Sequence, residues 1–119
     1  TFLFSLLASL ITGAADMEMP EFLIKVVTTE TLQKSQESGT LICEQMDIDD
    51  GYIHMATKEQ AEKVIKKFWS GKEYALLYLD PSKLIGTLKY EMGPSKKTKY
   101  YHLYDGHIPM TAVTKVVHP

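Results

Sequence analysis

A run of six residues, YALLYL at positions 74–79, constrains the fold of this chain more than any other segment. Successive side chains of a strand point to opposite faces, and this run is apolar on both. A strand of this kind needs cover on both sides and is typical of the centre of a sheet. A second β-rich run, FLIKVV at positions 22–27, predicts another strand. We therefore expect a sheet with further structure packed on it.

Residues 57–71 predict an amphipathic helix that packs on this sheet. Thr57 and Gln60 match the capping box, in which the two side chains satisfy each other's free backbone N–H groups. Lysines and glutamates fill one side of the helix, and Gly71 ends it. The other side is an apolar stripe at helical spacing, formed by Ala61, Val64, Ile65, Phe68 and Trp69.

The remaining segments predict one more helix and several strands. The polar stretch at 29–38 ends at Gly39 and has Leu32 as its one large apolar residue, so it predicts a short surface helix. Further strands are expected at 86–91, 100–104 and 111–117. The order of strand, helix, strand, helix and then mostly strands indicates an α+β fold with a largely antiparallel or split sheet.

Two strand-like segments each place a histidine on the same face as tyrosine. These residues are Tyr52 and His54 in the segment 51–55, and Tyr100, His102 and Tyr104 in the segment 100–104. If both strands line one cleft, it has aromatic walls and two imidazoles. Aromatic walls suit a flat heterocycle, and imidazole suits hydroxyl or phosphate contacts or proton transfer. The alternative is that each histidine is an ordinary half-buried strand residue.

The acidic run DIDDG, which ends at Gly51, does not fit a calcium-binding loop. With Gly51 at position six, positions one, three and twelve lack the oxygen ligands that the loop requires. They are Met46, Ile48 and Thr57. An aspartate-rich turn is the better interpretation.

Neither a metal site nor a cysteine nucleophile has support in the residue spacing. The residues available for zinc show no recognisable ligand spacing, so no metal site is predicted. They are His54, His102, His107 and Glu91. Cys43 is the single cysteine, so an internal disulfide is excluded. We interpret it as a small buried apolar residue, with a reactive thiol paired with His54 as the alternative.

The charge balance limits the classes of partner. The chain has 13 basic residues, all of them lysine, against 15 acidic residues, and its net charge is −2. This balance gives no electrostatic footprint for nucleic acid, so no nucleic-acid partner is predicted. Without arginine, an anion site has to use lysine, histidine or backbone N–H groups. The lysine-rich segment 96–99 is expected to be a solvated loop, with an anion-attracting rim as the alternative.

The first sixteen residues, TFLFSLLASLITGAAD, differ from the rest of the chain. Their apolar run has the length found in a signal peptide and is too short to span a bilayer. If residues 1–15 are a cleaved signal peptide, the protein is exported; otherwise a cytoplasmic protein begins at Met17 or Met19. In both cases we expect residues 17–119 to form a single domain with no stable membrane span. The sequence leaves the oligomeric state open.

Several motifs, in this order, resemble the family called domain of unknown function 952. The most specific are Asp50 to His54, Glu59-Gln60 and His102 to Tyr104, and the resemblance extends from about Ile24 to Val117. It implies the fold of the ADP-ribosyltransferase group. In that group a small split, mostly antiparallel sheet with two outer helices surrounds a nicotinamide-dinucleotide cleft. The cofactor that this fold implies is an NAD-like nucleotide.

The resemblance also implies roles for residues of both histidine segments. His54 would contact a ribose hydroxyl, and His102 would be a second polar contact or an acid–base group. Glu91 is the candidate catalytic carboxylate, with a solvent-facing side chain as the alternative. The tyrosines would wall the cleft and the capping-box residues would add contacts, which gives the ligand-binding set Tyr52, Tyr100, Tyr104, Thr57 and Gln60.

The chain departs from the family pattern in ways that bear on chemistry. Ala56 stands where the family usually has serine, so a hydroxyl available to a ligand is absent. The lack of arginine argues against the reaction of the RNA 2′-phosphotransferases of the same broad fold. The leading hypothesis is a domain that binds a nucleotide-like small molecule in a Tyr/His cleft, with weak or unknown transferase activity. The alternative is a non-catalytic binding or interaction module that keeps the fold without the chemistry.

Overall fold

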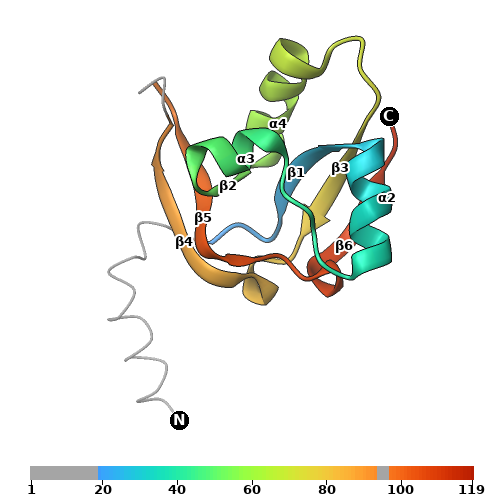
Figure 1. Ribbon diagram of the computed structural model, residues 1–119. Helices are drawn as coiled ribbons and strands as arrows, with labels where there is room; N and C mark the ends of the chain where they lie inside the picture. The colour runs from blue at the N-terminus through green and yellow to red at the C-terminus, as the bar shows by residue number, and fades with distance from the viewer. Residues whose placement is uncertain (1–18, 94–96) are drawn as a thin grey trace.

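The computed structural model describes residues 19–93 and 97–119, which form two three-stranded sheets and three α-helices (Figure 1). The expected signal peptide and Lys96 of the lysine-rich segment lie outside the described residues. In chain order the elements are β1 (Leu23–Thr28), α2 (Thr29–Ser38), α3 (Gln45–Asp50), β2 (Ile53–Met55), α4 (Lys58–Val64), the π-helical turn η2 (Ile65–Trp69), β3 (Tyr74–Leu79), the 3₁₀ turn η3 (Pro81–Lys83), β4 (Ile85–Met92), β5 (Lys99–His107), the 3₁₀ turn η4 (Met110–Ala112) and β6 (Val113–Val117).

The first sheet has the order β1-β3-β6 and contains the run YALLYL as its middle strand. β3 pairs antiparallel with both neighbours, which confirms the prediction of a central strand at 74–79. Ala75, Leu77 and Leu79 are fully buried in the main core, and the alternate residues of β3 are half-buried. Both faces of this strand are therefore covered to different degrees, as its apolar composition requires.

The second sheet has the order β2-β5-β4 and shares the main core with the first. The residues of its inner face that enter this core are Ile53, Met55, Tyr101 and Leu103. An isolated antiparallel bridge joins the sheets, because the N–H groups of Ile24 and Ala56 donate to each other's carbonyls at 2.7 and 2.9 Å. The opposite face of the second sheet therefore lies outside the main core.

Helix α2 coincides with the predicted surface helix at 29–38. The Thr28 hydroxyl accepts a hydrogen bond from the Thr31 N–H at 3.0 Å and caps its start. Gly39 ends the helix in the left-handed conformation, with φ of 83°. Leu32 is buried in the main core. Local signals alone thus fix both the position and the buried side of this helix.

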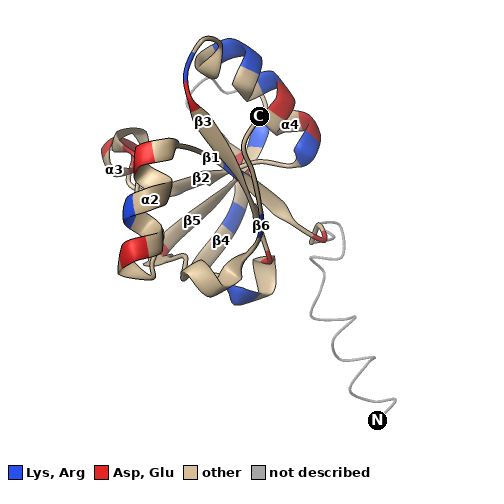
Figure 2. Cartoon of the chain, turned by 90° about the vertical axis from the view of Figure 1, so that its right-hand side faces the viewer, with Lys and Arg blue, Asp and Glu red and all other residues tan. Residues whose placement is uncertain are grey.

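Helix α4 begins as predicted, but its apolar stripe is only partly buried. Thr57 and Gln60 form the expected capping box. After Val64 the helix continues as the π-helical turn η2, whose wider winding changes which residues face the sheet. Only Ala61 of the stripe is buried, and Phe68 is 48% exposed, so the prediction of one fully packed stripe is wrong. Figure 2 shows lysine and acidic residues interleaved on the outer side of α4.

Residues 45–50, expected as an aspartate-rich turn, form the short helix α3 instead. The Asp47 carboxylate accepts a hydrogen bond from the Glu44 N–H at 3.1 Å, which caps the start of the helix. Gly51 ends it with φ of 82°. The glutamate and aspartate in these capping positions differ from the usual Ser/Thr-x-x-Glu/Gln pattern, which explains why the sequence signal is weak.

The fold is a small α+β domain with antiparallel sheets, as expected from the order of segments. It has a third α-helix beyond the two that were predicted, because of α3. Within residues 19–93 and 97–119, no helix combines the length and the apolar character needed to cross a bilayer.

We predict that Leu77→Ala lowers the free energy of unfolding by about 2–5 kcal/mol, because it opens a cavity in the main core. Phe68→Ala is the matched control for a large apolar residue outside the core, and its cost is expected to stay below about 1 kcal/mol. Urea unfolding of both variants measures the difference. Equal losses for the two substitutions would show that the π-helical turn does not expose Phe68 as described.

Candidate functional site

The outer face of the second sheet brings the two predicted histidines together. His54 of β2 and His102 of β5 are direct partners in the antiparallel register. Their ring centroids are 5.6 Å apart, and the rings meet edge to face at 72°. The side-chain alternation of the two strands therefore places both imidazoles on one face, as strand periodicity predicts.

Both ring nitrogens of His54 lie against carboxylates from α3. Nδ1 is 2.6 Å from Oδ1 of Asp47, and Nε2 is 2.9 Å from Oδ2 of Asp50. The Asp47 side chain is 2% exposed, whereas those of His54 and Asp50 are 24% and 31% exposed. Nδ1 of this imidazole thus contacts a buried carboxylate, and Nε2 contacts a partly exposed one.

The ring of His102 is buried beneath an aromatic cover. Nδ1 is 2.8 Å from Oε2 of Glu91, which also accepts a hydrogen bond from the Tyr104 hydroxyl. The ring of Tyr52 stacks on the imidazole, with centroids 3.9 Å apart, and leaves the side chain of His102 only 1% exposed. We call these residues the imidazole face: His54, His102, Tyr52, Tyr104 and Glu91.

A buried ion pair that no sequence pattern predicted lies behind His54. Nζ of Lys25, in β1, is 2.9 Å from Oδ2 of Asp47 and donates to the carbonyl oxygen of His54 at 2.9 Å. The side chains of Lys25 and Asp47 are 4% and 2% exposed. One feature of the sequence pointed to this pair. Lys25 is the single charged residue in the apolar run FLIKVV, and a lysine is rarely buried unless it is paired.

Several influences act on the pKa of Asp47. Burial tends to raise it, but the hydrogen bonds from His54 and the charge of Lys25 outweigh this effect. The result is a pKa lowered from 3.8 to about 2. Asp47 is therefore a carboxylate throughout the neutral range and can accept hydrogen bonds from several donors.

Glu91 and Tyr104 shift each other's pKa values in opposite directions. Hydrogen bonds from the Tyr104 hydroxyl and then from His102 lower the pKa of Glu91. The same bond to Glu91 raises the pKa of Tyr104 to about 12. Glu91 is thus an ionised acceptor with two partners, and its side chain is still 34% exposed, so both its predicted catalytic role and the solvent-facing alternative stay predictions.

Three residues that were predicted to contact the ligand make their contacts away from the two imidazoles. Tyr100 packs against a second apolar cluster that includes Ala56 and Ala61, beneath α4. The side chains of Thr57 and Gln60 bond to each other's backbone N–H groups, and Gln60 also donates to the Lys99 carbonyl at 2.7 Å. Ala56, where the family usually has serine, is itself buried in that cluster.

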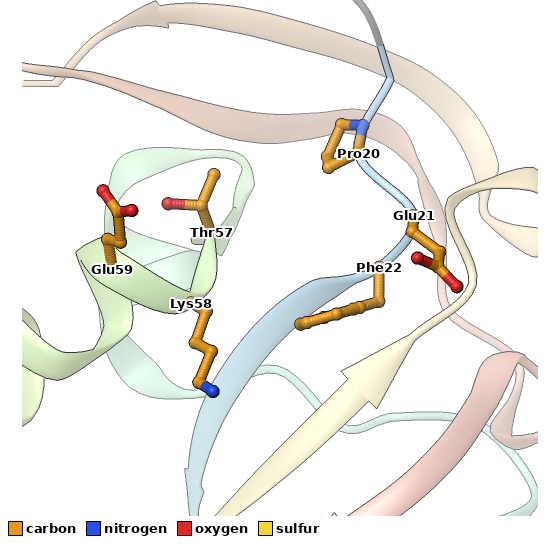
Figure 3. A pocket seen from close by; sticks show the side chains of 6 residues that line it. All are labelled: Pro20, Glu21, Phe22, Thr57, Lys58 and Glu59. Carbon is orange, nitrogen blue, oxygen red and sulfur yellow. The ribbon is translucent and has the colours of Figure 1, made fainter.

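Two hollows of about 350 Å³ each lie away from both imidazoles. The first lies between the start of β1 and the start of α4 and is lined by Pro20, Glu21, Phe22, Thr57, Lys58 and Glu59 (Figure 3). The second lies beside β3 and β6 and includes Tyr78 and Lys115. Neither is the Tyr/His cleft expected from the sequence, since Tyr52 covers His102 where that cleft was expected to open.

The other chemistry considered for the sequence involves metals and Cys43. In the part of the chain that the structure describes, no group of three or more His, Cys, Asp or Glu side chains is arranged to hold a metal ion. Cys43 is half-buried and packs against the main core. Burial raises the pKa of its thiol, which disfavours the reactive thiolate.

Comparisons with known proteins give a family and a fold. The model of the DUF952 family, described as a protein of unknown function, matches residues 26–116. The X-ray structures of CC0527 from Caulobacter crescentus and of its double variant have a TM-score of 0.72 and 23% sequence identity, covering 82% of this chain and 84% of that chain. The solution NMR structure of CC0527 has a TM-score of 0.70 and 21% identity, covering 83% and 84%. No curated protein matches. These neighbours show a shared fold and do not show the ADP-ribosyltransferase grouping that the resemblance implied.

We predict that acidification from about pH 4 to about pH 2 costs the wild type about 2 kcal/mol more than it costs Asp47→Asn. The pKa of Asp47 is about 2 in the folded protein and 3.8 ordinarily, so the unfolded chain binds the proton more readily. The stabilisation is fully present above pH 3.8 and is lost as the pH falls through 2. Urea unfolding at a series of pH values measures the effect.

Asp49→Asn is the control for this acid dependence, because Asp49 is exposed on the same helix. Its stability should follow the wild-type pH curve. If Asp47→Asn and the wild type lose stability in parallel, the lowered pKa of Asp47 is contradicted.

Proposed function

Since the chain belongs to the DUF952 family of proteins of unknown function, we propose that it binds a nucleoside-like small molecule on the imidazole face. The observation that carries this proposal is the pairing of His54 and His102 across two strands, each with Nδ1 held by a carboxylate. A carboxylate on Nδ1 fixes the orientation of an imidazole and leaves Nε2 to contact a ligand.

The two Nε2 atoms differ in how a ligand reaches them. At His54 the position is filled by Asp50, whose side chain is 31% exposed and can be replaced by a ligand hydroxyl. At His102, Nε2 has no hydrogen-bond partner among the described residues, and the Tyr52 ring covers the imidazole. A ligand would therefore meet His54 first and would reach His102 by displacing Tyr52.

The surrounding charges favour hydroxyl groups over phosphates at the imidazoles themselves. Asp47, Asp50 and Glu91 all hydrogen-bond to the two rings, and the lysine behind them is buried. Carboxylates repel a phosphate but accept hydrogen bonds from sugar hydroxyls. The phosphates of a nucleotide would have to lie toward Lys89, whose Nζ is 4.8 Å from the centre of the Tyr104 ring.

The aromatic rings suit the flat part of such a ligand. The Tyr52 ring lies 4.8 Å from His54 and 5.2 Å from Tyr104, measured between ring centroids. Both of these pairs are tilted, whereas Tyr52 stacks on His102, and aromatic pairs contribute about 0.5–1.5 kcal/mol beyond the area that they bury. A base that replaces Tyr52 on His102 would recover the stacking that is lost when the tyrosine moves.

The burial of His102 favours a second candidate, a binding module without chemistry. A side chain that is 1% exposed can serve the fold by its bond to Glu91 alone. Glu91 is itself engaged by two donors, so it is not a free base in this state. Incubation with NAD separates the two candidates, because release of nicotinamide that is abolished by Glu91→Gln supports a transferase, whereas binding without turnover supports the module.

We predict that adenosine and NAD raise the melting temperature and that His54→Gln weakens this binding about tenfold, the effect of one lost hydrogen bond. A ligand at one hundred times its dissociation constant stabilises the folded state by about 2.7 kcal/mol. His107→Gln is the control, since His107 is exposed at the end of β5, and its binding should match the wild type. The absence of any shift at millimolar ligand, or equal losses in both variants, would reject the proposal.

A further inference from the structure

Lys25 is a buried cation whose contacts converge on His54. Its Nζ meets both oxygens of Asp47, at 2.9 and 3.2 Å, and the carbonyl oxygen of His54 at 2.9 Å. Asp47 in turn accepts from the backbone N–H of His54 at 3.0 Å and lies 2.6 Å from its ring nitrogen Nδ1. The lysine therefore acts on both the main chain of His54 and the partner of its ring.

Packing alone does not require a charge at this position. Removing an ammonium from water is costly, and an apolar side chain of similar volume often replaces a buried ion pair with no loss of stability. On its own face of β1, Lys25 lies between Leu23 and Val27, which are both fully buried in the main core. The charge of Lys25 is thus best explained by its ion pair with the buried carboxylate of Asp47.

We propose that Lys25 is a positioning residue for His54: it keeps Asp47 ionised and aimed at Nδ1, so that Nε2 is the nitrogen presented to a ligand. This inference rests on the proposed function, in which His54 contacts the ligand. It extends that function by adding β1, an element of the other sheet, to the residues that prepare the imidazole face.

The charge balance explains why the lysine matters to a ring that it does not touch. With Lys25 in place, the buried Asp47 carboxylate is neutralised without a proton from the imidazole. Without Lys25, the buried carboxylate loses the cation that faces both of its oxygens, so its protonated form is favoured and its hydrogen bonds to the ring and N–H of His54 weaken.

Lys25→Met tests this assignment, with Lys34→Met as the matched control. Lys34 also forms an ion pair, with Glu30 at 2.9 Å, but its side chain is 60% exposed. We expect Lys25→Met to raise the pKa of Asp47 from about 2 by one unit or more, measured by carbon-13 NMR of the carboxyl group. Lys34→Met should leave it unchanged. An unchanged Asp47 titration in Lys25→Met overturns the proposal.

A second measurement covers the case in which Lys25→Met does not fold. In the wild type the Nζ resonance of Lys25 should respond to pH together with the Asp47 carboxyl, near pH 2, and independent responses overturn the proposal. Neither NMR measurement uses a ligand. If adenosine and NAD fail to bind the wild type but the Asp47 titration moves as expected, the proposed function fails while the Lys25–Asp47 linkage stands.

Discussion

The buried carboxylate of Asp47 is the interaction on which the rest of this structure depends. It accepts hydrogen bonds from the Glu44 N–H at the start of α3, from the His54 N–H in β2 and from Lys25 in β1. An ionised side chain that is 2% exposed is tolerated only when its oxygens are satisfied in this way. This one carboxylate therefore links β1 of the first sheet to β2 of the second, caps the start of α3 and orients the ring of His54.

These contacts hold the side chains of the imidazole face in fixed orientations. His54 is fixed from behind by the interior ion pair, and His102 is fixed by Glu91 with help from the Tyr104 hydroxyl. The Tyr52 ring then lies against both imidazoles. Polar groups held at set angles among aromatic rings are typical of sites that bind flat, hydroxyl-bearing molecules. CC0527 shares the fold of this chain at 23% sequence identity, and this likeness concerns the backbone arrangement alone.

The sequence predicts the parts of the molecule that depend on local patterns. The helix at 29–38, the capping box at Thr57 and the central strand at 74–79 are present because propensity and periodicity determine them. The side-chain alternation also places His54 and His102 on one face. The Lys25–Asp47 pair could not be predicted, because it joins residues 22 positions apart and depends on how two sheets meet. Helix α3 and the π-helical turn after Val64 were missed because their signals depart from the usual patterns.

Long-range ¹H–¹⁵N NMR of the His54 ring tests most directly whether Asp47 organises this site. The measurement is made at a pH where the imidazole is neutral and carries one proton. Because Asp47 is buried and lies 2.6 Å from Nδ1, whereas Asp50 beside Nε2 is partly exposed, we predict that the single proton is on Nδ1 and that Nε2 is unprotonated. A proton on Nε2, with Nδ1 unprotonated beside Asp47, would contradict it.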